Sequence, residues 1–275
     1  MNSLTEATTS LATSTVASTA PAIEHAEKGI NVVLKAEQIG TLFGMPLTNS
    51  LLMTWTVVAV LLFLAFFIRN RIRLIPGKLQ TAIEWLFEGV LGYMEETLED
   101  KKLARKFFPL IMTIFLFLLV ANEMAFIPGV GSVGVKEGAE LIPLFRAPAA
   151  DLNLTLALAI ISFVTIEVSG VVILGLAKYT KKYVNFSSPV NFIVGLIELL
   201  SNLGRLISFS FRLFGNIFAG EVMILVAGFF LAYLLPVPLM AFEVFVGFIQ
   251  AVVFSMLTLF FIKLSIMEPH GDEAH

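Results

Sequence analysis

The chain has 275 residues, of which 57% are hydrophobic and only 14% are charged, and its mean hydropathy is +0.90. A soluble globular domain carries about 25% charged residues, so this composition excludes an ordinary soluble enzyme and places the chain in a bilayer. The net charge of -3 gives no electrostatic reason to bind nucleic acid. Cysteine is absent and the three histidines lie near the termini, which excludes disulfides, thiolate metal sites and a buried histidine metal cluster. We therefore expect no cofactor and no bound metal.

The N-terminal segment is rich in Ser, Thr and Ala and has no Lys or Arg before Lys28. A secretory signal needs a basic start and an apolar core, and a mitochondrial presequence needs arginines. Because the segment has neither pattern and cannot bury a core, residues 1–40 are predicted to form a flexible tail. A cleaved leader of unusual type is the alternative. The missing arginines favour a bacterial inner membrane over an imported protein.

The first membrane span is predicted within residues 41–70. Its apolar run, 51–68, follows Thr48-Asn49-Ser50, which has good N-cap chemistry. The next segment, 71–106, contains apolar residues at steps of three or four over 77–99, with glutamates on the other side. This periodicity predicts an amphipathic helix that lies on a membrane surface or on a partner.

Two further spans are predicted within residues 107–182, at 107–128 and 152–177, on either side of a Gly- and Pro-rich loop. Segment 69–106 holds eight Lys and Arg residues and segment 178–182 holds three, whereas 1–47 and 129–150 hold two each. The positive-inside rule therefore puts the N-terminus outside and both basic segments in the cytoplasm.

A long helical hairpin is predicted over residues 183–268, followed by a cytoplasmic tail at 269–275. A helix from 190 to 228 would be roughly 58 Å long, about twice the hydrocarbon thickness, so it must tilt strongly, lie nearly flat or break. Pro236 and Pro238 are expected to form a turn before the apolar segment 239–267 returns. The predicted fold class is thus an all-α membrane protein with three transmembrane helices, one amphipathic surface helix and a tilted, membrane-embedded hairpin.

Apart from Lys263 and Glu268 at its cytoplasmic end, the predicted hairpin contains five charged residues, and such groups are costly at membrane depth and usually mark an ion path. They are Glu198, Arg205, Arg212, Glu221 and Glu243. The first three are spaced by seven, so they fall on nearly one helix face. Arg212 stays protonated and cannot relay protons, but the carboxylates can. The alternative for Glu198 is a position at the interface, with the charged end reaching water, and for Arg205 it is pairing between helices or a lipid-facing side chain whose charged end reaches water.

The residues around Arg212 carry a specific resemblance. The stretch RLFGNIFAGE at 212–221 resembles the signature of the a subunit (subunit 6) of F-type ATP synthases of bacterial type. Further similar stretches are RAPAADLNLTLALA at 146–159, PVNFIVGLIELLS at 189–201, FEVFVGFIQAVVFSMLT at 242–258, PLTNS at 46–50 and the FFPL…N stretch at 107–122. The resemblance covers about residues 40–268.

The resemblance implies an ion-translocating stator subunit whose hairpin packs against a rotating ring of c subunits, with b-type stalk subunits and membrane lipid as further partners. Two offset half-channels would carry protons to and from the ring. Arg212 matches the essential stator arginine that separates them. Asn216, Glu221, Glu243 and Gln250 are assigned to the outer half-channel, and Glu198 and Asn202 to the inner one. Many bacterial relatives carry His where this chain has Glu243, so a titratable group is retained there.

The residues alone leave two other functions for a membrane protein of this kind. A secondary transporter with intramembrane charges is the main alternative, but the two halves show no convincing repeat. A purely structural membrane subunit would not need the charged residues of the hairpin. Residues 129–134 match G-x-G-x-x-G, yet they lack the strand and helix that nucleotide binding requires, and the chain has no G-x-x-x-x-G-K-[ST] motif. We therefore expect a non-catalytic channel subunit that does not hydrolyse ATP alone.

Overall fold

The computed structural model describes residues 36–42, 44–127, 133–137, 140–183, 189–231 and 234–267. Most of the predicted N-terminal tail and the whole predicted C-terminal tail lie outside the described residues. The seven described helices are α2 (Asn49–Arg69), α3 (Lys78–Leu98), α4 (Lys101–Ala125), α5 (Leu152–Leu174), α6 (Leu176–Tyr183), α7 (Pro189–Phe230) and α8 (Pro236–Ile266). Among the residues described, five helices are long and apolar enough to cross a membrane, namely α2, α4, α5, α7 and α8.

Two short antiparallel hairpins and one turn of 3-10 helix accompany the helices. The elements are β1 (Gln38–Leu42) with β2 (Met45–Thr48), β3 (Gly134–Glu137) with β4 (Glu140–Pro143), and η3 (Pro148–Ala150). Gly44 has a positive φ of 81°, which glycine adopts at little cost in the turn after β1. The sequence reading expected tail and loop at these positions, because such short strands leave too weak a pattern.

Side-chain caps decide where α2 and α4 begin. Thr48 Oγ1 accepts a hydrogen bond from the backbone N–H of Leu51 at 3.3 Å, and α2 starts at the next residue, as predicted. Asp100 accepts from the N–H groups of Lys102 and Leu103 at 2.7 and 3.3 Å. Because of this cap, α4 starts at Lys101 rather than at residue 107, and its first turns carry the basic residues that were expected to precede it.

The third predicted span is divided in two. Gly175 has a φ of +83°, in the region that favours glycine, and ends α5. The short helix α6 follows as a separate element. The expected single helix over 152–177 is therefore wrong at its end, and two turns of α6 fold back towards α7.

The long hairpin of α7 and α8 forms without a break in α7. At 42 residues α7 is about 63 Å long at 1.5 Å per residue. Pro236 and Pro238 lie in the first turn of α8 instead of forming a separate turn before it. Proline is tolerated there because the first N–H groups of a helix have no partner within the helix.

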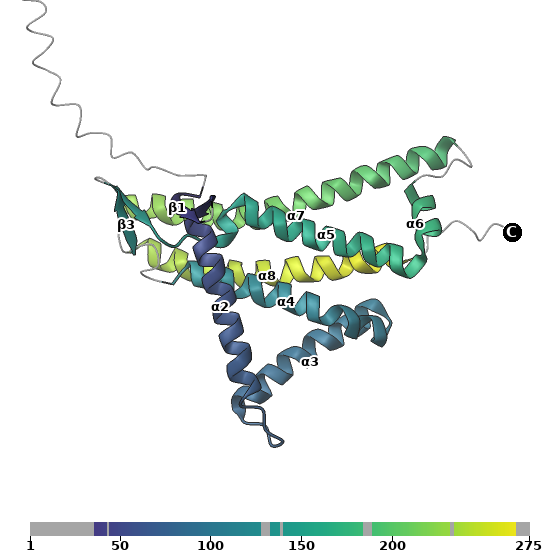
Figure 1. Cartoon of the computed structure of the whole chain (residues 1–275), viewed down its shortest axis with the longest axis horizontal. Coiled ribbons are helices and arrows are strands. Elements are labelled where there is room, and N and C mark those ends of the chain that lie inside the picture. The colour runs from purple at the N-terminus through teal and green to yellow at the C-terminus, as the bar shows by residue number, and fades with distance from the viewer. Residues whose placement is uncertain are drawn as a thin grey trace, which may run out of the picture. The chain divides into compact units, whose positions relative to one another are not determined.

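The helix packing centres on α8. Helix α5 packs against both α7 and α8, α7 packs against α8, and α4 packs along α8 (Figure 1). At the α4–α8 contact, Asn122 Nδ2 donates to the carbonyl oxygen of Gly247 at 3.0 Å. A side chain at Gly247 would press on the Cβ of Asn122, so glycine lets the two backbones approach. This contact fixes the stretch of α8 between Glu243 and Gln250.

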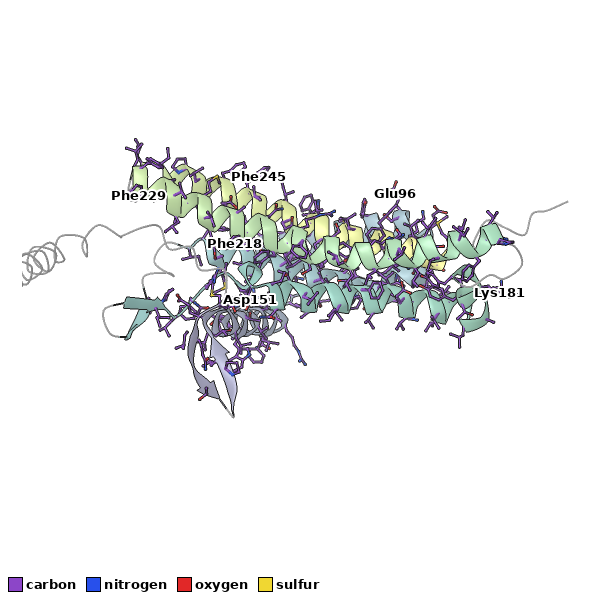
Figure 2. All side chains as sticks on the ribbon, turned by 90° about the horizontal axis from the view of Figure 1, so that it is seen from above. Glu96, Asp151, Lys181, Phe218, Phe229 and Phe245 are labelled. Carbon is purple, nitrogen blue, oxygen red and sulfur yellow. The ribbon has the colours of Figure 1, made fainter. Side chains whose placement is uncertain are left out.

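A buried polar contact joins the start of α2 to the start of α5. Ser50 Oγ donates to Asp151 Oδ2 at 2.5 Å, while Asp151 Oδ1 caps α5 by accepting from the N–H of Asn153 at 2.9 Å. Figure 2 shows Asp151 at one end of α5 and Lys181, on α6, at the other. Phe229 and Phe245 project outward from the hairpin and are 66% and 59% exposed (Figure 2). A helix satisfies its own backbone hydrogen bonds, and apolar side chains on its outer surface suit a lipid environment. The membrane-spanning part of the chain is all α-helical.

Candidate functional site

Arg212 lies in the middle of α7 with its side chain exposed. Its neighbour Leu213 is fully buried, so Arg212 stands at the border of the packed face of the helix. Within the described part of the chain, Arg212 makes no ion pair or hydrogen bond.

Asn216 and Gln250 join the two helices of the hairpin one turn beyond Arg212. Asn216 Nδ2 donates to Gln250 Oε1 at 2.7 Å, and Gln250 is 3% exposed. No group in the described residues accepts from Gln250 Nε2, which is buried. The sequence assigned both amides to the outer half-channel without pairing them; the structure adds this hydrogen bond and leaves one buried donor of Gln250 without an acceptor in the described residues.

Glu243 is buried against the backbone of α7. Its side chain is 4% exposed and lies on Gly220, where an added Cβ would overlap its carboxylate. Among the described groups none donates to Glu243 Oε2. Glycine at 220 therefore provides the space that the carboxylate occupies, one turn from the Asn216–Gln250 bond.

Glu221 forms an ion pair that the sequence reading missed. Arg146 Nη2 lies 3.5 Å from Glu221 Oε2, and the two side chains are 12% and 29% exposed. Arg146 comes from the segment just before η3, so a residue outside the hairpin reaches the site. Its position at the head of the RAPAADLNLTLALA stretch was the available signal. Asn216 and Glu221 lie within two turns of α7, and Gln250 and Glu243 on α8 contact the same stretch at Asn216 and Gly220.

The predicted inner residues lie further towards the N-terminus of α7. Asn202 is 5% exposed and its Nδ2 donates to the hydroxyl of Tyr183 at 2.6 Å and to Glu167 Oε1 at 3.2 Å. Glu198, one turn away, is half-buried. Glu167 lies within the predicted span 152–177, where its sequence context indicates no role, and the structure supplies its partners.

Arg205 differs from Arg212 in its surroundings. Its guanidinium carbon lies 4.8 Å above the centre of the Phe261 ring on α8. This cation–π contact gives the charge of Arg205 a partner on the neighbouring helix α8, which agrees with the alternative of pairing between helices.

The two polar groups are well separated along α7. Asn202 and Asn216 are fourteen residues apart, or about 21 Å of helix, and Arg212 lies between them. Each group contains a buried polar atom without a partner in the described residues, at Asn202 Oδ1 in one and at Gln250 Nε2 and Glu243 Oε2 in the other. Buried polar atoms are normally satisfied by protein or ordered water, so both groups are suited to hold water or an exchanging proton.

Comparison with known proteins decides the family. Residues 51–263 match the family described as ATP synthase A chain. The chain belongs to this family. It is 33% identical to ATP synthase subunit a of Geotalea daltonii over 221 residues, covering 79% of this chain and 87% of the relative. Subunit a of Desulfotalea psychrophila is 38% identical over 215 residues, with 74% and 79% covered, and that of Campylobacter jejuni is 34% identical over 205 residues, with 74% and 83% covered.

As a member of the ATP synthase A chain family, the chain is the proton-translocating stator subunit of the membrane sector of an F-type ATP synthase. This confirms the resemblance inferred from the RLFGNIFAGE stretch and disfavours the transporter alternative. The chain is a component of the ATP synthase complex and a multi-pass membrane protein.

Proposed function

We propose that the two polar groups on α7 are the ends of two half-channels and that Arg212 keeps them apart. The observation that carries this proposal is an exposed guanidinium that has no partner among the described residues and lies between two groups whose buried polar atoms also lack one there. A path that ran straight from Asn216 to Asn202 would have to pass this fixed positive charge, which repels a proton. Protons must therefore leave this chain on one side of Arg212 and return on the other.

In the outer half-channel, Asn216, Gln250 and Glu243 form the wall between α7 and α8, and Glu221 with Arg146 forms the approach. Glu243 and Glu221 can take up and release protons, whereas the amides orient the water between them. Because Arg146 stays protonated, its positive charge attracts the ionised carboxylate of Glu221. In the inner half-channel, Glu198 and Asn202 perform the corresponding exchange.

The carrier between the half-channels has to be a moving carboxylate on another chain. We infer that a ring of c subunits presents it to the exposed face of α7, with α7 and α8 as a tilted hairpin and α2, α4 and α5 as ordinary spans. The b-type stalk subunits and lipid would cover the exposed apolar faces of the other helices. The chain would lie in the bacterial inner membrane, with its N-terminus outside, its C-terminus in the cytoplasm, and no catalytic site of its own.

A cross-linking experiment tests the predicted contact with the ring. The chain has no cysteine, so a single Phe211→Cys substitution provides a unique thiol beside Arg212. Phe211 is 56% exposed. In assembled complexes, this thiol should form a disulfide with cysteines placed next to the ring carboxylate, while Ile161→Cys, 50% exposed on α5, should not. Equal cross-linking at both positions, or none at Phe211→Cys, would contradict the proposed orientation.

A further inference from the structure

Glu167 belongs to a hydrogen-bonded group that lies apart from the proposed outer path. We call Glu167, Tyr179, Tyr183 and Asn202 the inner cluster. Its members come from three helices: α5 supplies the carboxylate, α6 both tyrosines and α7 the amide. Tyr179 and Asn202 are each 5% exposed, whereas Glu167 and Tyr183 are only half-buried. The cluster therefore leads from the interior beside α7 to a more accessible carboxylate.

The hydrogen bonds of the inner cluster connect Asn202 with Glu167. Asn202 Nδ2 donates to the Tyr183 hydroxyl oxygen at 2.6 Å, so the hydrogen of Tyr183 is free to point either to Tyr179, whose oxygen is 3.1 Å away, or directly to Glu167 Oε2 at 3.4 Å. Tyr179 in turn donates to Glu167 Oε2 at 2.7 Å. The second hydrogen of the Asn202 amide goes to Glu167 Oε1 at 3.2 Å. The shorter hydrogen bonds thus lead from Asn202 through Tyr183 and Tyr179 to Glu167, and a longer one joins Tyr183 to Glu167 directly.

Two glycines allow α6 to bring its tyrosines to this place. A Cβ at Gly170 on α5, one turn from Glu167, would overlap the ring of Tyr179. A Cβ at Gly195 on α7 would overlap the backbone carbonyl of Tyr183. Both contacts lie within the cluster, so α6 is seated closely against its two neighbours rather than loosely connected to them.

The charged groups around the inner cluster leave Glu167 as its proton-binding member. Glu198 on α7 is close enough to act electrostatically on Tyr183, and burial raises the pKa of both tyrosine hydroxyls, so they stay protonated. On α8, Lys263 Nζ is bound to Glu99 Oε1 at 2.8 Å. On α7, Arg205 is held over the ring of Phe261. Lys178 is the cation nearest in sequence to Tyr179 on α6, and it has a partner.

We propose that Glu167 is a proton-exchanging carboxylate at the solvent end of the inner half-channel, connected to Asn202 by the two tyrosine hydroxyls. This inference rests on the proposed function and adds a group to its inner path. When a proton moves from Asn202 towards Glu167, Tyr183 receives a proton from water beside Asn202 while its own proton passes to Tyr179. The proton of Tyr179 passes to Glu167 Oε2, and Glu167 releases it to water. Each tyrosine ends neutral, and one proton has moved.

The test measures ATP-driven proton uptake by inverted membrane vesicles that contain the whole complex, per assembled complex and over a range of external pH. Glu167→Gln should lower the rate by about a hundredfold, the lower end of the effect of a positioned proton-transfer group, and should remove one titration step from the pH profile. Tyr179→Phe keeps the ring and should lower the rate about tenfold, as expected for one lost hydrogen bond. Glu167→Asp should retain both the activity and the titration step.

Thr165→Val is the matched control on α5, because among the described residues the Thr165 hydroxyl donates only to its own helix, at the carbonyl oxygen of Ile161. Wild-type rates in Glu167→Gln would overturn the inference, and so would an equal fall in Thr165→Val with an unchanged pH profile. If Glu167→Gln fails to assemble, a wild-type rate in Tyr179→Phe would overturn it instead. Arg212→Ala separates the two hypotheses. If this variant still pumps, the proposed function fails. If Arg212→Ala loses pumping while Glu167→Gln keeps the wild-type rate, only the role of Glu167 is refuted.

Discussion

Replacing Gly220 by alanine should displace the carboxylate of Glu243, a proposed proton carrier, while leaving the fold intact. The new Cβ would overlap the carboxylate of Glu243, which is the flexible end of a side chain and not backbone. Turning Glu243 away from its position costs about 0.5–1.5 kcal/mol as an off-rotamer strain. Alanine in place of glycine within a helix returns about 0.8–1 kcal/mol. The net change in stability should therefore be close to zero.

The proton path should respond quite differently from the stability. Because Glu243 can no longer lie against Gly220, one turn from the Asn216–Gln250 bond, Gly220→Ala should lower ATP-driven proton uptake while the complex assembles and resists heat as before. Adding Glu243→Asp shortens the side chain by one methylene and should restore part of the rate. Gly204→Ala is the matched control on α7, where a Cβ meets nothing within 4 Å.

Proton uptake in vesicles and the midpoint of thermal dissociation of the complex provide the two readouts. A normal rate in Gly220→Ala would refute the argument, because it would show that the position of the Glu243 carboxylate does not matter. A double variant no faster than Gly220→Ala alone would show that steric displacement is not the cause.

The other predictions concern contacts between helices. Asn216→Ala and Gln250→Ala should couple by about 0.5–1.5 kcal/mol in a double-mutant cycle of thermal stability, and additive effects would mean that their hydrogen bond contributes nothing. Lys263 holds the pKa of Glu99 below its usual range through a hydrogen bond and charge attraction, so the pair stabilises at neutral pH. That contribution should be lost as the pH falls through the lowered pKa, so wild type and Lys263→Gln should converge in acid; a constant difference would contradict the pairing. Gly195→Ala meets backbone and should destabilise by about 1–3 kcal/mol in thermal dissociation, and an unchanged midpoint would argue against the close seating of α6.

The sequence predicted the spanning elements well because apolar length and caps are local properties. The run ending at Arg69 and the N-cap at Thr48 are sufficient to define α2. The start of α4 was placed too late because a hydropathy pattern ignores the charged first turns that Asp100 caps. The division at Gly175 depends on one positive φ, which an isolated glycine in an apolar stretch does not reveal.

The candidate site was predicted only where its residues lie on one helix or carry the family signature. The face shared by Arg212 and Asn216 follows from helical periodicity, and the structure adds the bond to Gln250. The partnership of Arg146 with Glu221 joins residues 75 positions apart and arises only when the segment before η3 packs against α7. The partners of Glu167 likewise depend on the direction in which α6 turns.

The central claim is that Arg212 separates two proton paths, and proton pumping by the assembled complex tests it most directly. Arg212→Ala should abolish ATP-driven proton uptake by vesicles while the complex assembles normally. Arg205→Ala removes the same charge from the same helix, but among the described contacts it costs the one with the Phe261 ring. This variant should therefore retain most of the uptake. Coupled pumping at a normal rate by an assembled Arg212→Ala complex would contradict the account.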